Sequence, residues 1–127
     1  MMGLPAGSHV RSRSFGETSV VYAGDYLNKL IGERIERECR LQLAAGCRAL
    51  VINFRDTEQV NSIGISILLG VIDAAERSGA HLVFSDVNSQ TCSLFEMLGL
   101  TRHVALARDE QEALSTLNEF AVTAIGH

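Results

Sequence analysis

Residues 49–78 read ALVINF (49–54), RDTEQVN (55–61) and SIGISILLGVIDAAERS (62–78). The first segment is a short apolar run bounded by charged residues, which predicts a strand buried on both faces. The second segment is polar and predicts a loop. In the third, Ser62 is expected to cap an apolar helix over 63–78, which Gly79 closes in the usual C-terminal position of glycine. We therefore expect a buried strand that leads through a polar loop directly into a helix.

The same alternation of strands and helices continues on both sides of this unit. Upstream, segments 10–15 and 19–23 flank a turn at Gly16 and predict an N-terminal hairpin. The segment 27–44 repeats its apolar positions at helical spacing and carries charged residues on its other side, so it predicts a helix. Downstream, we expect strands over 81–87 and 103–107, a short helix that Asn88-Ser89 caps and that runs to Leu98, and a final helix capped by Asp109.

The predicted order of elements is β-β-α-β-α-β-α-β-α, which is typical of an α/β fold with right-handed crossovers. We expect a single mixed sheet of about five strands, in which an N-terminal antiparallel hairpin precedes mostly parallel strands, with about four helices. Such a sheet holds its functional loops at the carboxyl ends of its strands. The loop 55–61 and the start of the following helix lie at such an end.

Composition narrows the classes of function. The chain has 127 residues, of which 46% are apolar and 20% charged, as in an ordinary globular domain. A formal net charge of -4 argues against non-specific nucleic-acid binding, which needs a basic surface. The most apolar run, 63–72, is far shorter than the roughly 20 residues that a membrane span requires. We expect a domain over 9–121, preceded by a flexible leader or cloning remnant (1–8) and followed by a C-terminal tail (122–127).

The three cysteines and four histidines show no spacing that predicts a metal or redox site. There is no CxxC pair, and an odd number of cysteines in apolar surroundings favours a reducing compartment. We therefore expect no metal and no cofactor, and a cytoplasmic location. An α/β enzyme with an unrecognised site stays an alternative, although no paired catalytic constellation is visible.

Ser62 admits more than one interpretation. A nucleophile elbow requires G-x-S-x-G, and Ser62 has no glycine two residues before it, so a serine hydrolase is not supported. Its hydroxyl could simply bond an unpaired backbone N–H of the helix. Alternatively, a phosphate on Ser62 would be stabilised by the helix N-terminus and would add roughly -1.5 to -2 charge without disturbing the core. The helix-cap interpretation and the modification interpretation both remain open.

Leu69 is the one apolar residue on the polar side of the predicted helix, between Asp73 and Glu76 in projection. It is either part of the peripheral core or an exposed anchor for a partner, because single exposed leucines are common. The sequence leaves both alternatives open.

Five segments in the right order resemble the STAS domain, a family named after sulfate transporters and anti-sigma factor antagonists. They are Gly24 with Leu27-Asn28, VINF (51–54) followed by VNSIGI (60–65), SGAHL (78–82), LFEMLGL (94–100) and DEQEAL (109–114). The resemblance covers about residues 10–120, nearly the whole chain. It implies a STAS fold and a regulatory role rather than an enzymatic one.

The resemblance also implies a mechanism. An unphosphorylated antagonist binds an anti-sigma factor, which is also a serine kinase with a histidine-kinase-like ATPase fold, and a PP2C-type phosphatase reverses the phosphorylation that releases it. Ser62 matches the phosphoacceptor by position. The implied partner-contacting or loop-shaping residues, with Leu69 as the exposed-anchor candidate, are Asn61, Ile63, Gly64, Ile65, Asn28, Thr57 and Leu69. We expect a bacterial, cytoplasmic monomer or weak dimer with no nucleic-acid or membrane partner.

One residue departs from the family pattern. The best-known antagonists have Asp before the acceptor serine, whereas this chain has Asn61, which keeps the hydrogen-bonding reach and removes a charge. The alternative function within the same fold is a scaffold or ligand-sensing module that is not phosphorylated.

Overall fold

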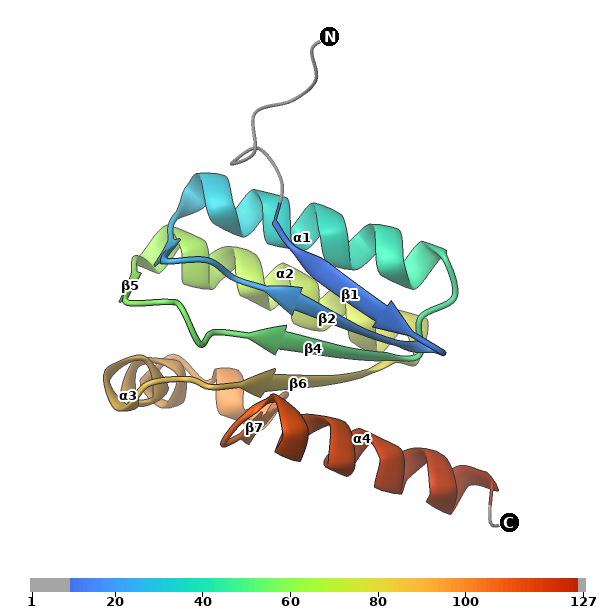
Figure 1. The fold of residues 1–127 in the computed structure, drawn as a ribbon. Helices are drawn as coiled ribbons and strands as arrows, with labels where there is room; N and C mark the ends of the chain where they lie inside the picture. The colour runs from blue at the N-terminus through green and yellow to red at the C-terminus, as the bar shows by residue number, and fades with distance from the viewer. Residues whose placement is uncertain (1–9, 126–127) are drawn as a thin grey trace, which may run out of the picture.

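The computed structural model describes residues 10–125, and the expected leader (1–8) lies outside the described residues. Its centre is a five-stranded sheet in the order β1-β2-β4-β6-β7 (Figure 1). β1 is antiparallel to β2, and the other neighbours are parallel. The strands are β1 (Ser12–Phe15), β2 (Thr18–Tyr22), β4 (Ala49–Asn53), β6 (His81–Ser85) and β7 (Ala105–Ala107). The predicted mixed sheet with an N-terminal hairpin is confirmed.

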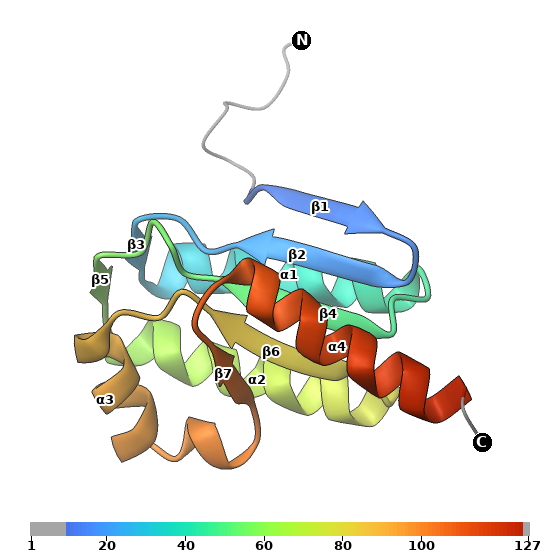
Figure 2. The same cartoon turned by 60° about the horizontal axis from the view of Figure 1, so that its bottom comes forward.

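Helices cover both faces of this sheet. α1 (Lys29–Ala44) and α2 (Ser62–Ser78) lie side by side on one face, and α4 (Glu110–Ile125) crosses the other face (Figure 2). α3 (Ser89–Met97) lies near the carboxyl end of β6 (Figure 2). The four helices agree with the predicted number. Within residues 10–125, no helix combines the length and the apolar character needed to cross a bilayer.

Each face of the sheet has its own apolar core, because successive side chains of a strand point to opposite faces. Towards α1 and α2, the rings of Phe54, Phe84 and Phe95 pack with centroids 5.2–5.6 Å apart. Towards α4, Val51 and Val83 belong to a smaller cluster that includes Ala113 and Leu117 of the helix. All five residues of β4 are buried, as the apolar run predicted.

Two short strands were not predicted. β3 (Tyr26–Leu27) and β5 (Gln59–Val60) pair in parallel as a separate ribbon, within segments expected as the start of a helix and as a loop. Two residues are too few to show a period, so only the pairing reveals them. α1 begins at Lys29 rather than at residue 27, because Asn28 caps it by accepting a hydrogen bond from Ile31 N at 2.9 Å. The predicted caps Asn88 and Asp109 are confirmed at 2.8 Å each.

Candidate functional site

The start of α2 follows the loop after β4, at the carboxyl edge of the sheet. Asn61 has an extended backbone (φ -122°, ψ 167°), and its Oδ1 accepts a hydrogen bond from Gly64 N at 2.8 Å. Asn61 is therefore the N-cap, and Ser62 is the first residue of the helix. The expected capping role of Ser62 is wrong because the preceding residue, which caps helices as well as serine does, already occupies that position.

This division of roles leaves the Ser62 side chain available. Ser62 is exposed, and its hydroxyl makes no hydrogen bond to any part of the chain that the structure describes. The backbone carbonyl oxygen of Ser62 accepts a hydrogen bond from Ser66 Oγ at 2.9 Å. The first turn of α2 contains no acidic residue. An accessible hydroxyl therefore stands at the positive end of a helix.

The loop before Ser62 is held by backbone pairing with the segment before α1. β5 pairs with β3, and Asn61 N donates to Leu27 O at 2.9 Å. The Thr57 hydroxyl donates to the carbonyl of Gly24, and Thr57 is 5% exposed. Because Thr57 is buried and bonded to the neighbouring loop, its position suits a loop-shaping role.

Gly64 allows the first turn of α2 to sit directly on β3. A Cβ at Gly64 would lie 2.5 Å from the carbonyl oxygen of Leu27, where no side-chain atom fits. The next residue, Ile65, is 2% exposed and belongs to the main core. Of the predicted site residues, Gly64 and Ile65 therefore support the position of Ser62 from below.

Other predicted site residues are on the surface. Ile63 is 52% exposed and Leu69 is 44% exposed, so Leu69 lies on the surface, and its role as an anchor for a partner stays a prediction. Leu69 follows Ser62 by seven residues, close to two full turns, and therefore lies on the same side of α2. Asn28 is half-buried and caps α1. We call the exposed set Ser62, Ile63 and Leu69 the α2 surface.

Sequence reasoning missed several neighbours of this surface. Tyr26 is 38% exposed, and its hydroxyl lies 3.5 Å from Asn61 Nδ2. Leu30, in the first turn of α1, is 53% exposed. A groove of about 440 Å³ lies between the β3–β5 ribbon and α3, with lining residues Tyr26, Gln59, Val60, Gln90, Thr91 and Leu94. No periodic signal marks these residues, because the β3–β5 pairing and the packing of α3 bring together segments that are far apart in the sequence.

The described residues hold no cluster of three or more side chains of the metal-binding types His, Cys, Asp and Glu. The arrangement at the start of α2 consists instead of a hydroxyl, exposed apolar side chains and unpaired helix-end N–H groups. Such a surface can receive a phosphoryl group and can pack against another protein.

Comparison with solved structures shows the same architecture in other proteins. The anti-sigma factor antagonist SpoIIAA in its unphosphorylated form aligns with a TM-score of 0.73 at 18% identity, over 87% of this chain and 96% of that chain. The phosphorylated form of the Bacillus cell fate determinant SpoIIAA aligns with a TM-score of 0.67 at 19% identity, over 84% and 97%. A variant of RsbS from Moorella thermoacetica aligns with a TM-score of 0.79 at 22% identity, over 90% and 98%. These likenesses show a shared fold.

The family model described as STAS domain matches residues 18–113, from the first residue of β2 into α4. This match spans most of the chain and includes the whole of the site at the start of α2. It confirms the resemblance that the sequence motifs carry. The protein belongs to the STAS domain family.

Proposed function

We propose that this protein is an anti-sigma factor antagonist that exchanges partners through phosphorylation of Ser62. The unphosphorylated form binds an anti-sigma factor that is also a serine kinase, and the phosphorylated form is released. One observation carries the proposal: the Ser62 hydroxyl is exposed and free of hydrogen bonds to the described residues, while Asn61 caps the helix.

The surroundings of Ser62 suit a phosphate. The helix N-terminus favours negative charge, and the first turn of α2 has no carboxylate to repel it. Asn61 contributes in the same direction, because an amide caps the helix through its oxygen without placing a negative charge beside the phosphate. Phosphorylation therefore changes the surface and leaves the fold intact.

The α2 surface explains why a phosphate would release a partner. Ile63 and Leu69 are half-exposed apolar side chains that follow Ser62 in the first turns of α2, and such side chains favour a dry contact. A phosphate on Ser62, at the end of that contact, would carry a charge of roughly -1.5 to -2. Burying this charge without a matching cation is costly, so the complex dissociates.

In this proposal the partners catalyse both the phosphorylation and the dephosphorylation of the domain. The kinase, of the histidine-kinase-like ATPase type, brings ATP and Mg²⁺, and a PP2C-type phosphatase removes the phosphate. In this scheme the STAS domain is a binding surface in the bacterial cytoplasm and not an enzyme. Gly64, Ile65, Asn28 and Thr57 hold the loop and the helix start in place, while Asn61 and the α2 surface meet the kinase.

Mass spectrometry of the protein isolated from its own cells tests this proposal. We expect one phosphate, located on Ser62 and removed by a PP2C-type phosphatase. The matched control is Ser66, an exposed serine one turn further along α2. Ser62→Ala should abolish the phosphate and Ser66→Ala should retain it. A phosphate on another residue, or none under several growth conditions, would reject the proposal in favour of a scaffold or sensor role.

A further inference from the structure

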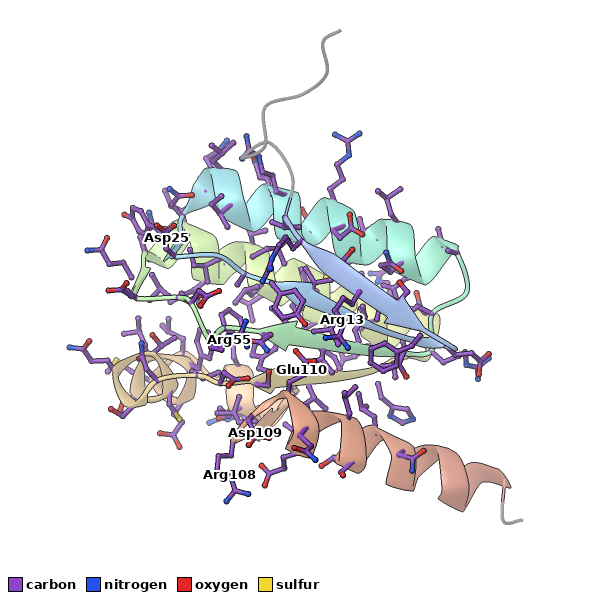
Figure 3. All side chains as sticks on the ribbon, viewed as in Figure 1. Arg13, Asp25, Arg55, Arg108, Asp109 and Glu110 are labelled. Atoms are coloured by element: carbon purple, nitrogen blue, oxygen red, sulfur yellow. The ribbon has the colours of Figure 1, made fainter. Side chains whose placement is uncertain are left out.

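A second groove lies on the face of the sheet that α4 covers, away from α1 and α2. It is between the β1–β2 hairpin and the start of α4. Its volume is about 590 Å³, and it is lined chiefly by Arg11, Arg13, Tyr22, Arg55, Glu110 and Leu114. Figure 3 shows Glu110, at the start of α4, between Arg13 of β1 and Arg55 of the loop after β4. The proposed switch does not involve these residues.

Side chains of two strands hold Glu110 in place at the floor of the groove by hydrogen bonds. Tyr22 and Asn53 are paired in register on neighbouring strands. The Tyr22 hydroxyl donates to Glu110 Oε1 at 2.8 Å, and Asn53 Nδ2 donates to the same oxygen at 3.0 Å. Asn53 is 2% exposed. The carboxylate of Glu110 is therefore held towards the sheet, and only its other oxygen approaches an arginine, 3.7 Å from Arg13 Nη1.

Two of the arginines rest on aromatic rings. The guanidinium carbon of Arg11 lies 4.8 Å from the centroid of the Tyr22 ring, and that of Arg13 lies 5.6 Å from the centroid of the Phe15 ring. A ring occupies one face of each guanidinium. Within the described residues the in-plane N–H groups of Arg11 face no carboxylate, whereas Arg13 Nη1 also approaches Glu110. This orientation suits the paired hydrogen bonds that arginine donates to phosphate and carboxylate groups.

The charges of the groove are unbalanced. Three arginines and one glutamate among the lining residues give the groove a net charge of +2, in a chain whose net charge is -4. Asp56 lies 3.8 Å from Arg55, but both side chains are 60% exposed, so this contact is weakened by solvent. Within the described residues, Arg11 makes no ion pair. The groove thus concentrates positive charge on an acidic protein.

We propose that this groove binds a small organic dianion, a phosphate monoester or a dicarboxylate, through Arg11, Arg13 and Arg55. The charge of +2 matches a dianion, and the volume is within the range of small-molecule sites. The Tyr22 ring and Leu114 form an apolar wall for the body of the ligand. The site is separate from the proposed switch, because α2 covers the other face of the sheet (Figure 2).

NMR titration of the ¹⁵N-labelled protein tests this inference at constant ionic strength. The probes are phenyl phosphate, phthalate and inorganic phosphate. We expect saturable shifts of the Tyr22 and Gln111 amides and of the arginine Nε–H signals with phenyl phosphate or phthalate. The stronger of these two probes identifies the acidic group. Weaker binding of inorganic phosphate shows the contribution of the apolar wall.

Matched variants locate the site. Arg11→Gln and Arg55→Gln should each weaken binding of the stronger probe about tenfold, since each loses a charged hydrogen bond. Arg37→Gln removes an equal charge from an exposed position on α1 and should leave binding unchanged. Shifts that do not saturate, or equal weakening by Arg37→Gln, would overturn the inference. Neither result bears on Ser62, because this titration requires no phosphorylation.

Discussion

The amide oxygen of Asn61 accepts a hydrogen bond from the backbone N–H of Gly64 at 2.8 Å, directly across the first turn of α2. This bond pairs one of the backbone N–H groups that have no partner inside the helix, so the side chain of Ser62 is not needed as the cap. Helix capping and the exposed hydroxyl therefore belong to adjacent residues. A change at Ser62 is consequently expected to leave the stability of the fold nearly unaffected.

Urea denaturation should separate these two residues. Asn61→Ala is expected to lower the free energy of unfolding by about 1 kcal/mol, because it removes the cap. Ser62→Ala should change it by less than about 0.5 kcal/mol, as at other exposed positions. Asn61→Asp serves as the control, since aspartate also caps. A larger loss in Ser62→Ala than in Asn61→Ala would show that the cap is assigned to the wrong residue.

A negative charge at Ser62 should weaken binding of the kinase that we propose as the partner. We expect Ser62→Asp to weaken the complex roughly 100-fold, equivalent to about 3 kcal/mol, because the carboxylate loses its hydration without gaining a cation. Ser62→Ala should bind as the unmodified protein does. Isothermal titration calorimetry with the purified kinase measures both. Ser115→Asp, at an exposed serine of α4 on the other face of the sheet, controls for charge alone. Wild-type affinity in Ser62→Asp would refute the switch.

Two glycines of α2 should respond differently to a methyl group. Alanine favours helices, yet Gly64→Ala places Cβ 2.5 Å from the backbone carbonyl of Leu27, which cannot move easily. We expect a loss of about 1–3 kcal/mol in unfolding free energy. At Gly70 the added Cβ would meet only the end of the flexible Glu36 side chain, at 2.8 Å. Gly70→Ala should therefore be neutral or stabilising in the same urea experiment.

Tyr22 should make stability depend on pH in the alkaline range. Burial, followed by the hydrogen bond and charge of Glu110, raises the pKa of Tyr22 above its ordinary 10.0. The unfolded chain then loses this proton at lower pH than the folded protein. The stabilising contribution is complete below pH 10 and declines as pH rises through the folded pKa. In urea denaturation over a range of pH, Tyr22→Phe should therefore show a smaller decline than the wild type above pH 10. Equal declines in the two proteins would contradict the assignment.

Local pattern was sufficient for most of the fold. The apolar run 49–54 predicted a strand with both faces covered, and every residue of β4 is buried. Gly79 ended α2 as expected, in the left-handed conformation (φ 71°) that glycine adopts without strain. These predictions succeed because strand burial, helical period and helix ends depend on a few residues that are close in the chain.

The same reasoning did not identify the residue that caps α2. Asn61 and Ser62 are adjacent and both cap helices well, so composition cannot choose between them. The choice follows from the pairing of β5 with β3, which keeps the backbone extended through Val60 and brings Asn61 N to Leu27 O. That pairing joins two-residue strands that are far apart in the sequence.

The surface features could be identified only from the tertiary structure, for a related reason. Periodicity placed Leu69 on the polar side of the helix without deciding whether it is exposed, and only the packing of α2 against its neighbours leaves it 44% exposed. The arginine groove draws Arg11, Arg55 and Glu110 from three distant segments. The order and type of the elements are thus encoded locally, through side-chain period and turn chemistry. The cap, the exposed serine and the second groove arise from long-range contacts, because a hydrogen bond or a charge cluster depends on which segments folding brings within a few ångströms.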